Sequence, residues 1–316
     1  MNIAQNLVSP KLAKRSLNFL WAVFRTVLIL GLAFVIVQPL LMSVASSFKS
    51  MADLYDPSII FIPKDFTLEN YKTVWEQIDY PVRFVNSVLY CVVCSFLQLS
   101  SCTLVAYGIA RFNFKGRGII FAMAMITLVI PPESILLSLY LQFKSFGPVT
   151  IFTLGHVMKG IDLTGSVVPM LLLSSTAVGF KNGLYIFLLR QYFRNQPKEL
   201  EEAAYIDGYG RFSTFLRVML PGSASMMATV FLFSFVWQWN DSFYTPVLSP
   251  GLEVFTTVLP HLGIMVSFSQ GNVVETVQNL LYDSAGLVMH IIPLLILYLF
   301  TQKLFVQSIT RSGLVE

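Results

Sequence analysis

The sequence predicts an all-α polytopic integral membrane protein with six transmembrane helices. Of its 316 residues, 55% are hydrophobic and only 12% are charged, whereas a soluble domain carries about 25% charged residues. Six segments approach the length of about 20 apolar residues that a membrane span requires. Three cysteines are too few for a disulfide scaffold, the apolar content excludes a disordered chain, and a net charge of +4 does not indicate nucleic acid.

The predicted spans follow the apolar segments along the chain. The first contains no charged residue, the third contains Pro131-Pro132, at which a helix must kink, and the fourth contains Lys181. The segment 149–158 is too short to span and is expected to lie in an external connection or to lengthen the fourth span. The predicted spans are 26–48, 84–110, 119–141, 167–189, 223–239 and 285–305.

The distribution of Lys and Arg predicts that both termini are cytoplasmic. Counted over alternate segments, 14 of the 21 basic residues fall on the side of the termini and six on the other side, and cytoplasmic segments carry the excess of positive charge. The segment 241–283 has no Lys or Arg, as expected of an outside loop.

The N-terminal region is basic and then apolar, as in a signal peptide, but its apolar stretch is too long and lacks a small-residue cleavage site, so we expect an uncleaved first span. Residues 17–25 are expected at the inner membrane interface, with Trp21 and Arg25 as anchors. The predicted organisation is a cytoplasmic N-terminus with an interfacial helix (1–25), a membrane domain (26–310) and a cytoplasmic tail (311–316).

No pattern in the sequence indicates catalysis or metal binding. The three histidines are isolated from one another, and no GxxxxGK[ST] phosphate-binding loop occurs. Cys91 and Cys94 have CxxC spacing but lie within an apolar span, where packing is the favoured interpretation because a thiolate in hydrocarbon is costly. We therefore expect a chain that is not an enzyme and has no catalytic or metal-binding residues.

The loop 195–221 predicts two short helices. Asn195 can cap the first, Gly208 can end it in a left-handed conformation, and Pro221 marks the return to the membrane after a second helix at 211–220. Adjacent Ala203 and Ala204 would form a small knob that a partner's groove could receive. The alternative is an ordinary solvated helix-turn-helix.

This loop resembles the EAA motif of the membrane subunits of ABC importers. It contains Glu202-Ala203-Ala204, three residues, Gly208, nine residues, Val218, one residue and Leu220-Pro221, with Val where the family has Ile. Asp207 before the glycine and Trp239-Asn240-Asp241 at the end of the fifth span are similar to the carbohydrate-uptake, maltose-type branch.

The resemblance implies a type I ABC importer permease fold and a role in ATP-driven, binding-protein-dependent import of a sugar or oligosaccharide across the bacterial cytoplasmic (inner) membrane. The implied partners are a second homologous permease, two ATPase subunits that carry ATP and Mg, and an extracytoplasmic solute-binding protein. The chain itself would bind no cofactor. The residues expected to couple to the ATPase are Glu202, Ala203, Ala204, Asp207, Gly208, Leu220 and Pro221.

Two further segments gain an expected role from the resemblance. The outside loop at about 244–281 would reach the binding protein, and the tail 311–316 would enter the ATPase interface. The loop residues expected at the binding protein are Pro250, Gly251, Leu252 and Glu253.

Three polar residues are candidates for the translocation pathway: Lys181 and Glu133 within spans, and Asn240 at the end of the fifth span. A charge at such depth costs several kcal/mol unless it is paired or hydrated. The alternatives to a pathway role are a structural ion pair or a shifted span whose charge reaches the interface.

Three other functions stay open from the sequence: an ABC permease for a non-sugar solute, an ion-coupled secondary transporter, and a membrane-embedded enzyme or scaffold. A secondary transporter would be expected to show paired broken helices in two repeated halves, and only the Pro-Pro break in the third span is evident.

Overall fold

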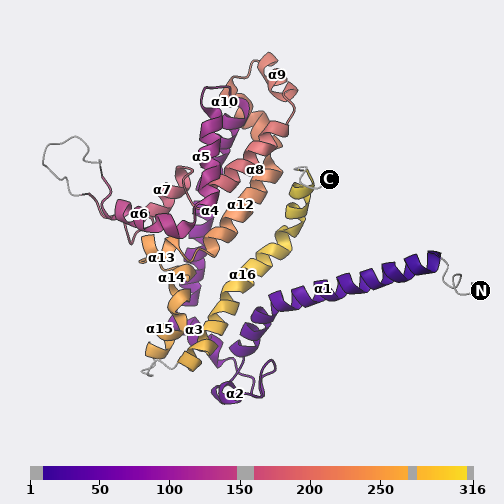
Figure 1. Cartoon of the computed structure of the whole chain (residues 1–316). Coiled ribbons are helices and arrows are strands. Elements are labelled where there is room, and N and C mark those ends of the chain that lie inside the picture. Colours follow the sequence, from indigo (N-terminus) through magenta and orange to yellow (C-terminus); the bar gives the residue numbers. More distant parts are fainter. Residues whose placement is uncertain (1–9, 148–159, 270–275, 312–316) are drawn as a thin grey trace, which may run out of the picture. The chain divides into compact units, whose positions relative to one another are not determined.

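The computed structural model describes residues 10–147, 160–269 and 276–311, and these ranges are helical apart from turns, loops and one isolated β-bridge between Phe146 and Ile161 (Figure 1). The prediction of an all-α protein is confirmed. The chain forms two compact units, one comprising 1–74 and 263–288, the other 75–262 and 289–316.

The first unit begins with α1 (Pro10–Ser47), a single continuous helix. Its segment Asn18–Ser47 is long and apolar enough to cross a membrane. The helix passes through Arg25 without a break, so the predicted interfacial segment 17–25 and the predicted span 26–48 belong to one helix.

Short polar elements follow α1 in the first unit: α2 (Met51–Tyr55) and α3 (Glu69–Gln77), the latter ending in the second unit. Buried Asp53 organises the connection between them, because its carboxylate accepts hydrogen bonds from the N–H groups of Lys64 and Asp65, both at 2.9 Å. The remaining helix of this unit is α15 (Leu262–Ser269), with the first part of α16 (Thr276–Arg311).

The second unit is built around α4 (Tyr80–Arg111), which packs against α7, α8 and α12. These helices bury a hydrophobic cluster that includes Leu99 and Cys102 of α4. The helices that pack against α4 are α7 (Val168–Ser175), α8 (Asn182–Asn195) and α12 (Ala224–Trp239), while α5 (Arg117–Val129) packs against α8 and α6 (Pro132–Lys144) against α13 (Tyr244–Leu248).

The third predicted span is broken more sharply than a kinked helix. Helices α5 and α6 meet at an angle of 106°, with Ile130 and Pro131 extended between them. The predicted site of the break is correct, since two adjacent prolines remove two helix donors and crowd the preceding carbonyls. The bend exceeds the predicted kink, and the span 119–141 stays a prediction.

The fourth predicted span, 167–189, is not one continuous helix in the structure, since α7 ends at Ser175 and α8 begins at Asn182. It breaks over residues 176–181, where Ala177 and Lys181 have φ of 58° and 63°. Donors from α4 bind carbonyls that the break exposes: Gln98 Nε2 lies 3.2 Å from the Phe180 oxygen and Ser101 Oγ 2.8 Å from the Ser174 oxygen. Lys181 therefore lies at a helix start and not within a helix.

Three continuous helical segments of the described residues are long and apolar enough to span a membrane, at Asn18–Ser47, Tyr80–Arg111 and Gln278–Gln302. Two bent pairs also pass this test as pairs, α5 with α6 and Arg211–Gly222 with Ala224–Trp239. The polytopic membrane fold is thus supported, and the count of six spans stays a prediction.

Candidate functional site

The loop that carries the EAA residues begins with α9 (Glu199–Ile206). Its expected cap, Asn195, is instead the last residue of α8. Gln196 is extended (ψ 139°) because it precedes Pro197, and a residue before proline is disfavoured in the helical region. The new helix therefore begins only after the proline.

Gly208 ends α9 as predicted, with φ of 85°. The N–H of Tyr209 bonds to the Ala204 oxygen at 2.9 Å, and the N–H of Gly208 bonds to the Tyr205 oxygen at 3.1 Å. This pair of bonds is a Schellman motif, which satisfies carbonyls at a helix end and needs a left-handed residue. The turn between the two short helices is therefore fixed by Gly208.

The second short helix spans Arg211–Gly222, through α10 (Arg211–Thr214), a π-helical turn (Phe215–Met219) and α11 (Leu220–Gly222). Pro221 cannot donate to the carbonyl of Arg217, and its ring crowds that carbonyl. In the π turn the N–H of Leu220 bonds instead to the Phe215 oxygen. The π turn directs Phe215 and Met219 into the interior, where they are 5% and 1% exposed.

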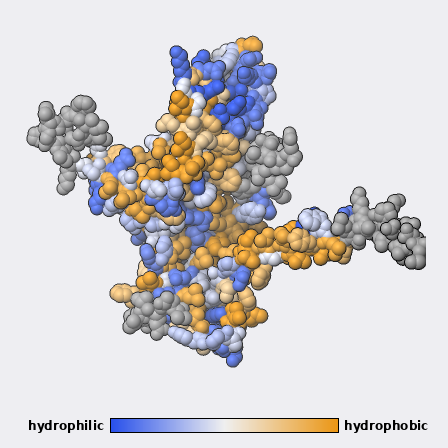
Figure 2. Space-filling view, in the orientation of Figure 1, coloured by the Kyte–Doolittle hydropathy of each residue, from blue (hydrophilic) through white to orange (hydrophobic). Residues whose placement is uncertain are grey.

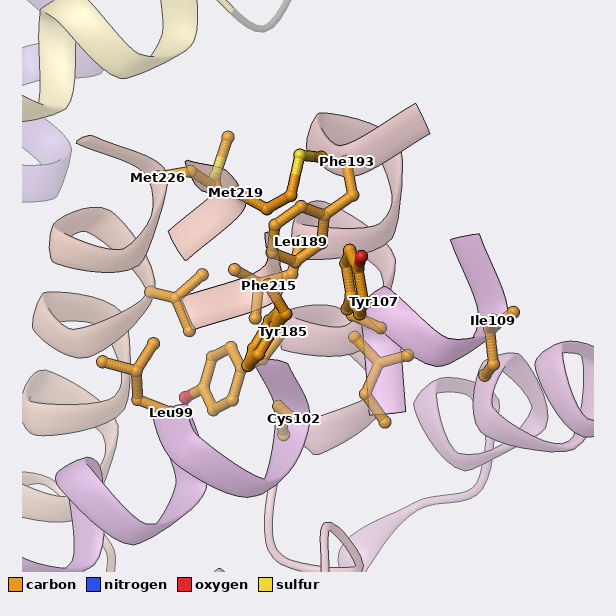
Figure 3. Close-up of a cluster of buried hydrophobic side chains, with 13 residues drawn as sticks. Leu99, Cys102, Tyr107, Ile109, Tyr185, Leu189, Phe193, Phe215, Met219 and Met226 are labelled. Carbon is orange, nitrogen blue, oxygen red and sulfur yellow. The ribbon is translucent and has the colours of Figure 1, made fainter. Parts of the chain in front are cut away.

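Phe215 joins the loop to the membrane helices. Its ring centroid lies 4.6 Å from that of Tyr107 on α4, and Tyr107 in turn packs edge-on against Phe193 of α8 at 5.4 Å (Figure 3). Met219, Leu189 and Met226 belong to the same buried cluster. The loop is thus held by the same hydrophobic core that joins α4, α8 and α12.

Glu201 provides a second, polar attachment of α9 to α4. The Tyr107 hydroxyl donates to Glu201 Oε1 at 2.8 Å, and Arg111 Nε lies 3.7 Å from the same oxygen. Arg111 also donates through Nη2 to the Gln196 oxygen at 2.8 Å. This role of Glu201 was not predicted from the sequence. Glu201 and Ala204 are three residues apart and share a helix face, but the burial of Ala204 is evident only in the structure.

The opposite face of α9 is free. Glu202, Ala203, Asp207 and Gly208 are exposed, whereas Ala204 is buried, so the expected two-alanine knob is reduced to Ala203. Large apolar side chains are exposed beside these residues, with Ile206 at 86% and Phe212 at 69%. Hydrophilic residues gather around α9 and α10 (Figure 2). An exposed acidic and apolar surface of this kind is suited to docking against a partner protein.

Leu220 and Pro221 differ from the exposed residues in position. They lie in α11, at the sharp turn of 77° between the second short helix and α12. The Tyr192 hydroxyl of α8 donates to the Gly222 oxygen at 2.8 Å and fixes this turn. Leu220 and Pro221 therefore lie at the junction of the loop with α12, away from the free face of α9.

The three pathway candidates do not form one site. The Lys181 ammonium lies over the rings of Trp237 (4.6 Å) and Phe180 (5.0 Å), and no ion pair joins it to Glu133, although both residues are described. Glu133 is exposed in the first turn of α6 and lines a cavity of about 300 Å³ that includes neither other candidate. Asn240 caps α12 and donates to the Val236 oxygen at 2.8 Å.

The C-terminal end of α12 leads into the expected outside loop through Asp241. Its buried carboxylate accepts the N–H groups of Phe243, Tyr244 and Thr245 at 2.8–3.1 Å. The cap formed by Asp241 was not predicted from the sequence. Short helices follow: α13 (Tyr244–Leu248), α14 (Phe255–Val258), a 3₁₀ turn (Leu259–His261) and α15.

Residues 250–253 form an exposed turn that is attached at both sides. The Gly165 N–H donates to the Leu248 oxygen at 3.0 Å, and Asn86 Nδ2 donates to the Glu253 oxygen at 3.2 Å. Gly251 approaches Gly165 so closely that a Cβ would lie 2.7 Å from the Gly165 oxygen.

Pro250, Gly251 and the Glu253 side chain are exposed, and Leu252 is half-buried. Nearby, the Thr164 hydroxyl and N–H bind the Asp162 carboxylate and hold the pKa of that exposed group below its usual range.

The segment 149–158 and residues 312–316 of the tail lie outside the described residues.

Comparisons with known proteins place this geometry in context. A family model described as "Binding-protein-dependent transport system inner membrane component" matches residues 102–311. The chain is 29% identical to the arabinooligosaccharides transport system permease protein AraQ of Halalkalibacterium halodurans, over 89% of this chain and 92% of that protein. It is 28% identical to the diacetylchitobiose uptake system permease protein NgcG of Streptomyces coelicolor, over 92% and 88% respectively.

A solved structure shares the fold. It is a bacterial ABC transporter involved in the import of the acidic polysaccharide alginate, and it aligns with a TM-score of 0.70 at 20% identity, covering 95% of this chain and 99% of that chain.

The attachment of the loop through Phe215 predicts a stability effect. Phe215→Ala removes a buried ring and should destabilise the purified protein by about 3–5 kcal/mol, measured as a lower thermal unfolding midpoint in detergent. The matched control is Leu216→Ala, whose side chain is 43% exposed. Equal midpoints for the two variants would contradict the attachment.

Proposed function

The chain belongs to the family of binding-protein-dependent transport system inner membrane components, and we propose that it is the permease subunit of an ATP-driven importer for a sugar or oligosaccharide. The observation that carries the substrate class is that relatives matched over most of their length are permeases for arabinooligosaccharides, diacetylchitobiose and maltodextrin. The free face of α9 supports the ATP-driven mechanism, because it offers a docking surface firmly joined to the membrane helices.

The proposed assembly contains this chain, a second homologous permease, two ATPase subunits that bind ATP and Mg, and an extracytoplasmic solute-binding protein. The chain lies in the bacterial cytoplasmic membrane with both termini inside. The excess of Lys and Arg on the side of the termini supports this orientation. It places α9 at the cytoplasmic face and residues 250–253 outside.

In the proposed mechanism, closure of the ATPases displaces α9, and the displacement reaches the spans as a rigid-body movement. Two attachments support this transmission: the Phe215 ring against Tyr107, and Glu201 bound by Tyr107 and Arg111. Because both act on α4, which packs against α7, α8 and α12, a movement of α9 would be transmitted to the centre of the bundle.

Lys181, Glu133 and Asn240 are proposed to face the translocation pathway at separate points. Lys181 is half-buried, lies at a helix break and is not neutralised by an ion pair within the described residues. An unpaired cation in a membrane protein faces water or a polar ligand. Trp237 beside it is 39% exposed and offers an apolar face to a sugar ring.

The substrate class is tested with the complete transporter reconstituted in proteoliposomes with its binding protein. Neutral oligosaccharides, acidic oligosaccharides, amino acids and peptides are compared as substrates. We expect one class of oligosaccharide to stimulate ATP hydrolysis and to accumulate inside the proteoliposomes. Stimulation by amino acids or peptides alone would contradict the sugar assignment. Uptake driven by an ion gradient without a co-purifying ATPase would contradict the ATP-driven mechanism.

Coupling is tested at the free face of α9. Glu202→Lys reverses an exposed charge that we propose to pair with a basic residue of the ATPase, and it should reduce uptake per ATP hydrolysed by about tenfold, because like charges placed opposite each other disfavour docking. Glu199→Lys is the control, since it makes the same change at another exposed position of the same helix. Equal uptake by the two variants, both inserted normally, would contradict the role of Glu202.

Contact with the binding protein is tested at Glu253. Glu253→Lys should raise the concentration of loaded binding protein needed for half-maximal ATPase stimulation by about threefold to tenfold, because charges at the rim of an interface control association. A deletion through 254–255 is unsuitable, since Val254 and Phe255 are 3% and 2% exposed and belong to the core. Glu76→Lys, at an exposed residue of α3, is the control, and an equal effect there would contradict a specific contact.

A further inference from the structure

A basic cavity of about 680 Å³ lies where the ends of α4, α5 and α8 meet the loop of α9 and α10. Each of its cationic residues stands at or next to the end of a helix. The cationic residues are Arg111, Arg117, Arg194, Lys198 and Arg211.

The cavity carries an excess of positive charge. Its five cations face two carboxylates, Glu201 and Glu202, which leaves a formal excess of three charges. Glu201 is already occupied by the Tyr107 hydroxyl and by Arg111. Among the described residues that ion pair is the only one, so the other four cations have no carboxylate within ion-pair distance.

The lining is partly preorganised for an anion. The Arg111 side chain is only 6% exposed, and its buried Nε has no hydrogen-bond partner. Arg117 is held by bonds from its Nη1 to the Phe112 oxygen (3.2 Å) and to Asn113 Oδ1 (2.9 Å). Guanidinium groups fixed in this way favour planar oxyanions and phosphates, which they bind through two parallel hydrogen bonds.

The position of the cavity favours a lipid as the source of the phosphate. Arg111 is the last residue of α4 and Arg117 the first of α5, so the cavity lies at the level where the apolar helices leave the bilayer on the basic, cytoplasmic side. Basic pockets between helix ends on this side are suited to anionic headgroups.

An apolar surface adjoins the cavity on α5. Ile119, Ile120 and Met123 follow Arg117 and are 68%, 45% and 62% exposed, so acyl chains can lie beside the cavity. Phe112 and Phe114, also exposed, occupy the loop between α4 and α5, and aromatic rings are favoured at the headgroup level.

We propose that this cavity binds the phosphate headgroup of an anionic membrane lipid and thereby links the cytoplasmic ends of α4, α5 and α8 to the coupling loop. The bound headgroup would supply the negative charge that the chain lacks and would stiffen the loop against the spans. The proposal requires that the chain lies in the membrane with the proposed orientation, and it does not depend on which sugar is transported.

The test is native mass spectrometry of the complete transporter, purified in mild detergent and incubated with phosphatidylglycerol or cardiolipin, with phosphatidylcholine as the neutral lipid. The wild type should retain the anionic lipids, and the double variant Arg117→Gln/Arg194→Gln should retain them at least about tenfold less, because each basic residue contributes to the attraction of an anionic headgroup. The matched control, Lys115→Gln/Arg217→Gln, removes two exposed cations that do not line the cavity and should behave as the wild type.

Thermal unfolding midpoints show whether the variants fold, and Arg194→Lys, which keeps the charge, should retain most of the lipid. Equal lipid retention by the double variant and the control would overturn the proposal. Retention of inorganic phosphate at millimolar concentration, with no preference for anionic over neutral lipid, would also overturn it by identifying a soluble anion. If lipid is retained only after the ATPase subunits are removed, the proposal is overturned, because an acidic segment of the ATPase then occupies the cavity in the complete transporter.

Discussion

The contact of Tyr107 with the loop 195–221 is the interaction on which the arrangement of that loop depends. One side chain of α4 contributes a ring that packs against Phe215 and Phe193 and a hydroxyl that donates to Glu201. Both short helices of the loop are therefore held by the same residue, one by apolar packing and one by a charge-assisted hydrogen bond. This double attachment separates α9 into a fixed face, with Glu201 and Ala204, and a free face, with Glu202 and Ala203.

Hydrogen bonds from a few side chains of α4 also hold the interior of the second unit. Gln98 of α4 binds the Phe180 oxygen at the break between α7 and α8, and its own oxygen accepts a hydrogen bond from Ser234 of α12. Tyr90, two helical turns away, bonds to Thr245, which also binds Asp241. The break between α7 and α8 is thus satisfied by side chains from α4. That is the condition under which irregular backbone is tolerated at membrane depth.

The sequence was informative where local chemistry decides the structure. The all-α membrane fold followed from composition, the left-handed Gly208 from the need to end α9, and the break at Pro131-Pro132 from the loss of helix donors. It was uninformative where the decisive partner lies elsewhere in the chain. The break before Lys181 contains no proline and depends on donors from α4, so hydropathy alone predicted one continuous span.

The different positions of Glu201 and Glu202 also could not be predicted from the sequence, because the decisive partners lie on another helix. Adjacent acidic residues in the first turn of a helix are equivalent in their interaction with the helix dipole, and the motif directs attention to Glu202. Their directions differ by about 100° around the helix axis, so only one of them can face α4. Glu201 is the one that meets Tyr107 and Arg111, and Ala204, three residues later on the same side of the helix, is buried. The direction of each side chain around the helix therefore separates Glu201, which is bound to α4, from Glu202, which is exposed.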